Sequence, residues 1–189
     1  MAANGRYFIV QALTGVRVAL AASAAALLTY CSPGSIGAWA VVVLLMAVEL
    51  TDFLDGRLAR RFGVGSRFGE LFDPYCDSIS RLIVFYGLVM AWLIPVWLLL
   101  LLALRDVTVA YIRIMCLHRG RKVAARASGK IKAILQGGGA IVLAGMFAWP
   151  VLPHTTGTAL RWSAIACVAA VTAWSAVDYF VAAVRNDAQ

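Results

Sequence analysis

Long apolar stretches separated by short polar or basic segments dominate the chain. An α-helix needs roughly 20 apolar residues to cross the hydrocarbon core of a membrane, and the chain is long enough for six such helices. The pattern predicts an all-α integral membrane protein in which residues 7–13 extend the first span as an interfacial helix. We expect six transmembrane helices at 16–30, 36–54, 71–93, 96–117, 134–149 and 159–184.

The third and fourth spans depend on where the chain turns. Residues 82–104 carry no charge, so hydropathy by itself would make them one span. The Arg-rich segment after the second span and the basic segment at 119–132 would then lie on opposite sides of the membrane. Because Lys and Arg favour the cytoplasmic side, we expect a hairpin near Pro95, with both basic segments and both termini in the cytoplasm. The single span at 82–104 is the alternative.

This hairpin places ionisable residues inside the third and fourth spans. Such groups are costly at membrane depth and normally face a polar cavity. We therefore expect a charged, hydrated cavity that opens to the cytoplasm. The residues concerned are Asp73, Asp77, Arg81, Arg105, Asp106 and Arg113.

Composition agrees with a membrane protein. Of the 189 residues, 62% are hydrophobic and 14% are charged, and the mean hydropathy is +0.84. These values exclude a disordered chain and argue against a soluble domain, so we treat residues 1–189 as one membrane domain. The net charge of +8 fits positive-inside topology and anionic lipid or phosphate ligands better than nucleic acid. A cleaved signal peptide is the alternative to a retained first helix, although Arg17 interrupts its apolar run.

Acidic residues gather between positions 52 and 77. Asp52 and Asp55 are three residues apart, and Asp73 and Asp77 are four apart, so each pair shares one face of a helix. Two helix ends joined by a loop could bring the four carboxylates together, where their repulsion would be relieved by Mg²⁺ or Mn²⁺. Two metal ions at such a site commonly serve phosphoryl chemistry. The alternative is that these acids pair with the neighbouring arginines.

The same segment resembles a family signature. It reads D-x-x-D-G-x-x-A-R-x8-G-x3-D-x3-D from Asp52 to Asp77, and every fixed position matches that of the CDP-alcohol phosphotransferases. The resemblance implies a six-helix membrane enzyme of phospholipid biosynthesis. In that reading Asp52, Asp55, Asp73 and Asp77 bind two divalent ions, and Asp77 is also the general base for the acceptor hydroxyl.

The resemblance also implies a nucleotide site. Small residues and an arginine in the signature would line the CDP moiety, and a partial match around Leu13 adds two residues from the first span. The implied CDP-binding residues are Gly56, Ala59, Arg60, Ser66, Gly69, Thr14 and Arg17.

The second half of the chain resembles the phosphatidylglycerophosphate synthase branch of this family. Arg105-Asp106, then Arg113, then Gly129-Lys130-Ile131-Lys132 follow the pattern of that branch. The implied reaction transfers the phosphatidyl group of CDP-diacylglycerol to sn-glycerol 3-phosphate and releases CMP. The implied acceptor-phosphate residues are Arg105, Arg113, Lys130 and Lys132, although the two lysines can also be read as ordinary positive-inside residues.

Two rival functions stay open on the sequence. Within the family the acceptor could be inositol phosphate, inositol or serine. A divalent-cation transporter is a rival outside it, but it gives no reason for the glycine-rich loop that contains Arg60. Relatives form homodimers, so we expect a homodimer, with membrane lipids as its surroundings and an active site on the cytoplasmic side of a bacterial-type cell membrane.

Overall fold

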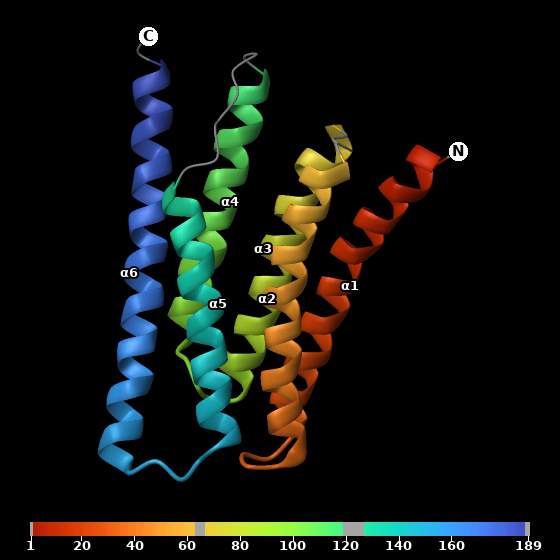
Figure 1. Ribbon diagram of the computed structural model, residues 1–189. Helices are drawn as coiled ribbons and strands as arrows, with labels where there is room; N and C mark the ends of the chain where they lie inside the picture. Colours follow the sequence, from red (N-terminus) through yellow and green to blue (C-terminus); the bar gives the residue numbers. More distant parts are fainter. Residues whose placement is uncertain (1, 63–66, 119–126, 188–189) are drawn as a thin grey trace.

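The computed structural model is a bundle of α-helices (Figure 1). It describes the backbone of residues 2–62, 67–118 and 127–187, and the side chains of residues 15–51, 72–116 and 127–184. The described backbone contains six helices and no strand. These helices are α1 (Ala2–Tyr30), α2 (Ile36–Phe62), α3 (Arg67–Met90), α4 (Val96–His118), α5 (Ala127–Ala148) and α6 (His154–Asp187).

Successive helices run in opposite directions, as in an up-and-down bundle (Figure 1). The three short connections, at 31–35, 91–95 and 149–153, lie at one end. The start of α1 and the end of α6 lie at the other end, together with the helix ends that border residues 63–66 and 119–126 (Figure 1). This arrangement confirms the predicted hairpin near Pro95 and excludes a single helix over 82–104.

Backbone hydrogen bonds explain the tight turn of that hairpin. Leu93 N–H donates to the Leu88 carbonyl at 3.0 Å, and Trp92 N–H donates to the Val89 carbonyl at 3.0 Å. These two bonds form the Schellman motif that often ends a helix. Trp92 occupies the position that glycine usually fills, with φ of 59°, which costs a residue with a side chain about 1–2 kcal/mol. Pro95 then separates the turn from α4.

The helices form two groups that meet along α2 and α5. Helix α1 packs against α2 and α3, and α6 packs against α4 and α5, while α3 also touches α4 and α5. A side chain at Gly87 would bring its Cβ within 2.7 Å of the Ala25 Cα, so α1 and α3 approach this closely only because residue 87 is glycine. Fully buried apolar side chains fill the interior, the largest being Phe85, Leu28, Leu88, Leu98, Leu102, Leu143 and Ile165.

The observed helices are longer than the predicted spans. Helix α1 is continuous from Ala2 to Tyr30, so residues 7–13 are part of it and not a separate segment; their position at a membrane interface stays a prediction. Helices α2, α5 and α6 also extend beyond the predicted limits, to Phe62, from Ala127 and from His154 to Asp187. Hydropathy detects the apolar part of a helix, whereas backbone hydrogen bonding continues into polar flanks.

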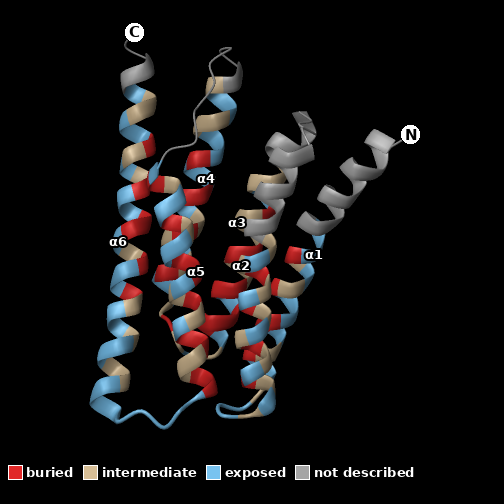
Figure 2. Ribbon diagram, in the orientation of Figure 1, coloured by how far each residue is buried: buried red, intermediate tan, exposed pale blue. Residues whose placement is uncertain are grey.

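The described surface is apolar. Large hydrophobic side chains are exposed on all six helices, and the buried residues face the spaces between helices (Figure 2). Soluble monomers rarely expose large apolar patches, so the many exposed large hydrophobic side chains favour a membrane protein. Two of the described helices, at Ala127–Ala148 and His154–Val184, are long and apolar enough to cross a membrane.

Candidate functional site

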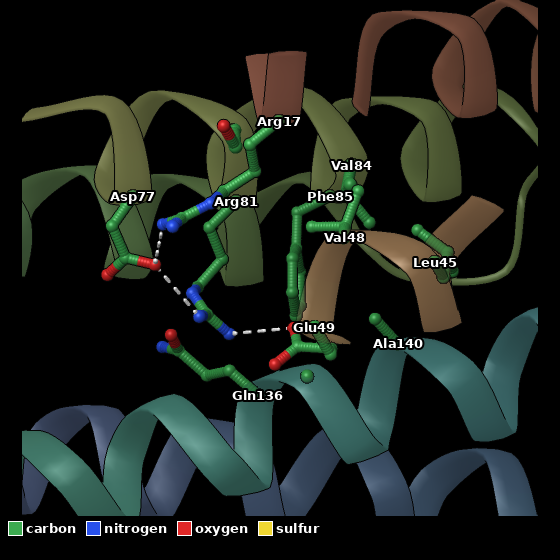
Figure 3. Close-up of a pocket in the computed structure, with 12 residues that line it drawn as sticks. Arg17, Leu45, Val48, Glu49, Asp77, Arg81, Val84, Phe85, Gln136 and Ala140 are labelled. Carbon is green, nitrogen blue, oxygen red and sulfur yellow. Dashed lines mark hydrogen bonds and ion pairs between the residues drawn. The ribbon is translucent and has the colours of Figure 1, made fainter. Parts of the chain in front are cut away.

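A pocket with charged walls lies where α1, α2, α3 and α5 meet (Figure 3). Arg17 comes from α1, Glu49 from α2, Asp77 and Arg81 from α3, and Gln136 from α5. Four helices thus contribute a charged or polar group each to one small space. The apolar part of the lining consists of Leu45, Val48, Val84, Phe85 and Ala140.

Asp77 is held between two arginines. Its Oδ1 lies 3.2 Å from Nη2 of Arg81 and 3.7 Å from Nη1 of Arg17. Both guanidinium groups are almost fully buried, whereas the Asp77 side chain is 32% exposed. The carboxylate is therefore oriented from the interior of the bundle while part of it stays accessible. The predicted base and the predicted CDP-binding Arg17 are brought together.

The expected metal site is described only in part. Asp73 and Asp77 lie one turn apart on α3, and the Asp73 side chain is half-buried. The side chains of Asp52 and Asp55 lie outside the described residues, although their backbone belongs to α2. Among the side chains that are described, no group of three His, Cys, Asp or Glu could hold a metal ion. The two described acids supply the oxygen donors that Mg²⁺ and Mn²⁺ prefer, so they fit the expected ions.

Most of the expected CDP site also lies outside the described side chains. Only Arg17 can be placed, against Asp77. Ser66 lies in the undescribed connection between α2 and α3, and for the rest only the helical backbone is described. Those remaining residues are Thr14, Gly56, Ala59, Arg60 and Gly69.

A second buried cluster joins α4, α5 and α6. Lys132 Nζ donates to Oδ1 of Asp106 at 2.7 Å, and Arg105 Nη1 donates to the same oxygen at 2.9 Å. Arg105 Nη2 also donates to the Ser175 hydroxyl at 2.7 Å. All of these side chains are buried, so each charge has the partner that burial demands. Arg105, which the sequence assigns to the acceptor phosphate, is thus paired with Asp106.

Tyr179 of α6 connects this cluster to Arg113. The Arg113 guanidinium lies 5.8 Å from the centre of the Tyr179 ring and donates to its hydroxyl at 3.3 Å. Arg105 lies 5.3 Å from the same ring, so the ring stabilises both cations by cation–π contact. A Cβ at Gly129 would come within 3.1 Å of the Tyr179 hydroxyl. The structure therefore brings Arg105, Arg113 and Lys132 together, whereas Lys130 is exposed.

Sequence reasoning missed several members of these clusters. Glu49, Ser175 and Tyr179 received no role, and Arg81 was expected only in the wall of the cavity. A signal existed for two of them, because Glu49 is an acid within an otherwise apolar stretch and Arg81 follows Asp77 by four residues. Nothing local marks Ser175 or Tyr179, because their partners lie about 70 residues away along the chain.

Comparison with known proteins gives a consistent result. The family model for CDP-alcohol phosphatidyltransferase matches residues 8–177. The CDP-diacylglycerol–glycerol-3-phosphate 3-phosphatidyltransferase of Treponema pallidum is 36% identical over 99 residues, which cover 52% of this chain and 46% of that protein. A probable phosphatidylglycerophosphate synthase of Mycobacterium tuberculosis is 30% identical over 157 residues, which cover 82% of this chain and 69% of that protein.

A solved structure shares the fold. The crystal structure of Mycobacterium tuberculosis phosphatidylinositol phosphate synthase with CDP-DAG bound superposes with a TM-score of 0.60 at 23% identity, covering 96% of this chain and 91% of that one. The match extends over all six helices of this chain. Since the family model also spans nearly the whole sequence, this chain belongs to the CDP-alcohol phosphatidyltransferase family.

Proposed function

We propose that this protein transfers the phosphatidyl group of CDP-diacylglycerol to sn-glycerol 3-phosphate, giving phosphatidylglycerophosphate and CMP. Family membership supports the transferase chemistry and disfavours the cation transporter. Relatives named for glycerol 3-phosphate transfer or phosphatidylglycerophosphate synthesis support this acceptor. The rival acceptor is inositol phosphate, after the name of the structural relative.

One observation is the main support for a phosphorylated acceptor. Arg105, Arg113 and Lys132 converge at the α4–α6 cluster, and Asp106 is the carboxylate that contacts two of them. These three cations and one carboxylate carry an excess of positive charge, and all of them except Arg113 are buried. Such an excess suits a dianionic phosphate, which arginine binds with good geometry. Free inositol carries no charge and serine carries no phosphate, so neither supplies the dianion that this excess of positive charge suits.

In the proposed reaction Asp77 accepts the proton of the acceptor hydroxyl. The resulting oxygen attacks the phosphorus that carries the diacylglycerol, its bond to the CMP oxygen breaks, and CMP leaves. Arg17 and Arg81 hold the carboxylate in place through their contacts with Oδ1. General base catalysis of this kind typically contributes about 10²–10⁴-fold.

We also propose that Asp52, Asp55, Asp73 and Asp77 hold two Mg²⁺ or Mn²⁺ ions. Bound there, these ions would neutralise the pyrophosphate and the departing phosphate. The CDP moiety would lie against Arg17 and the other signature residues given above.

In the membrane we propose six spans, with both termini and the active site at the cytoplasmic end. Support comes from the bundle, which places the borders of both basic segments at one end, where the positive-inside rule favours them. We further propose that the protein works as a homodimer, the commonest symmetric assembly.

The function is tested by CMP release from CDP-diacylglycerol. Purified protein in detergent or lipid nanodiscs is supplied with Mg²⁺ or Mn²⁺ and, one at a time, glycerol 3-phosphate, inositol phosphate, inositol, serine or no acceptor. Release that depends on glycerol 3-phosphate is the expected result. Release with inositol phosphate would support the transferase activity but show that the acceptor is inositol phosphate. No release from folded protein with any acceptor would contradict the proposal.

Arg113→Ala should weaken acceptor binding specifically. The KM for glycerol 3-phosphate is expected to rise about tenfold or more, because a hydrogen bond to a charged group contributes about 1.5–3 kcal/mol. The KM for CDP-diacylglycerol should stay within about twofold, since Arg113 contacts α6 and not the pocket around Asp77.

A matched control is Arg161→Ala. Arg161 lies near the start of α6, at the opposite end of the bundle, and its replacement should leave both KM values unchanged. Equal increases in both KM values for Arg113→Ala would remove Arg113 from the acceptor site.

A further inference from the structure

Glu49 is a charged residue that the family signature does not include. It lies in α2, one turn before Asp52, after an apolar stretch that begins at Ile36. Its side chain is 33% exposed, and its Oε1 lies 3.6 Å from Nη1 of Arg81 (Figure 3). An acid in this setting needs a cationic partner or a function to offset the cost of its burial, and Arg81 of α3 is such a partner.

Arg81 connects three helices through one guanidinium group. Nη2 donates to Oδ1 of Asp77 at 3.2 Å within α3, and Nη1 donates to the Ala133 carbonyl of α5 at 2.9 Å. The ion pair with Glu49 adds α2. Because a guanidinium is planar and rigid, fixing one side of it against α2 and α5 also fixes the direction of the bond to Asp77.

Gly137 determines where the Glu49 carboxylate can lie. A Cβ at residue 137 would overlap the carboxylate of Glu49, whereas a Cβ at the next residue, Gly138, would meet no atom within 4 Å. The Glu49 carboxylate can therefore keep its present position only because residue 137 has no side chain. Gly137 and Gly138 are adjacent on the same helix, but a side chain at Gly137 would contact Glu49 and a side chain at Gly138 would not.

We propose that Arg81 is a positioning residue that orients the Asp77 carboxylate, and that Glu49, seated against Gly137, holds Arg81 in the orientation that does so. The inference rests on the proposed function, in which Asp77 takes the proton of the acceptor hydroxyl. It adds that residues of α2 and α5 determine how the Asp77 carboxylate is oriented. Ala133 follows Lys132 directly, so the same arginine joins the base to the helix that carries part of the acceptor cluster.

The test compares Gly137→Ala with Gly138→Ala. Gly137→Ala changes no charge but displaces the Glu49 carboxylate, so kcat should fall about 10- to 100-fold, the loss expected when a reacting group is misplaced by about 1 Å. Both KM values should stay within about twofold, because neither substrate-binding cluster is altered. Gly138→Ala should retain wild-type kcat.

Variants that change the charge of Glu49 or Arg81 independently test whether these residues orient Asp77. Glu49→Gln should lower kcat like Gly137→Ala, and the double variant should lose no more than the larger single loss, because both changes act through Arg81. Arg81→Gln should cost more than either, and Arg81→Lys should recover part of that loss. Tm should stay close to wild type in Gly137→Ala, and Mn²⁺ binding, followed by electron paramagnetic resonance, should fall much less than kcat, because three of the four proposed metal ligands are unaffected. These readouts separate positioning of the base from loss of metal or of fold.

Three results would overturn the inference. These are a kcat within about twofold of wild type for both Gly137→Ala and Glu49→Gln, additive losses in the double variant, or a fall in Mn²⁺ binding that matches the fall in kcat. Wild-type protein that releases no CMP with any acceptor would contradict the proposed function itself, and the inference with it.

Discussion

Asp77→Asn is expected to reduce CMP release by about 10³-fold or more, because the variant loses the proton acceptor that we propose for the reaction. Asparagine keeps the size of the side chain and can still accept the hydrogen bond that Arg81 donates at 3.2 Å. Arg81 also retains its contacts with Glu49 and with the Ala133 carbonyl. The fold should therefore survive, and the loss should appear in kcat.

The measurement is CMP release at saturating substrates, with Tm and gel filtration in detergent as controls for folding. Asp77→Glu distinguishes the presence of a carboxylate from its position, since it keeps the charge but moves it further from the backbone. We expect Asp77→Glu to recover little activity, because the arginines around Oδ1 favour one position of the carboxylate. Near-normal turnover in Asp77→Asn would remove Asp77 as the base.

Asp106→Ala is expected to be the most destabilising single change in the second cluster. It leaves Lys132 and Arg105 without the carboxylate that both contact, at 2.7 and 2.9 Å, in a region where their side chains are 5% and 8% exposed. Breaking a buried ion pair by removing one partner costs about 3–5 kcal/mol. Thermal unfolding should show a decrease in Tm of about 10 °C for a chain of this size.

A second substitution checks that buried charge causes this loss. Lys132→Met in the Asp106→Ala background removes one of the two unpaired cations, so the double variant should unfold at a higher temperature than Asp106→Ala. The coupling between the two sites should be about 0.5–3 kcal/mol, as is usual for residues in direct contact. A Tm for Asp106→Ala within about 2 °C of wild type would show that the ion pairs of Asp106 contribute little to the free energy of unfolding.

The two clusters are connected by α5. Lys132 belongs to the buried cluster of α4, α5 and α6 that we propose binds the acceptor, and the next residue, Ala133, accepts a hydrogen bond from Arg81, which contacts Asp77. Four residues further along the helix, Gly137 makes room for Glu49. A shift of α5 along its axis would therefore change the acceptor cluster and the geometry of Asp77 together. This coupling gives a physical reason why acceptor preference and turnover should change together in variants that move α5 as a whole, whereas Gly137→Ala, which displaces only the Glu49 side chain, should change kcat without changing either KM.

Much of the fold followed from the sequence by itself. The apolar stretches, together with a turn near Pro95, predicted six helices, and all six are present in the described backbone. The turn near Pro95 was predicted from the positions of arginine and lysine, although hydropathy favoured one long span. Local chemistry was sufficient here because helices depend on backbone hydrogen bonds within the segment and on apolar length. The spacing of Asp73 and Asp77 likewise placed both on one face of α3.

Only the tertiary structure decided which charged groups are partners. Nothing in the order of residues shows that Asp106 contacts both Arg105 and Lys132, that Tyr179 lies against Arg105 and Arg113, or that Glu49 faces Arg81. These pairings depend on how each helix is rotated and shifted along its neighbours. Rotation and shift are set by close packing, such as the approach of α2 to α5 at Gly137. That packing is a property of several helices at once, because a side chain on one helix is excluded or admitted by the surface of another.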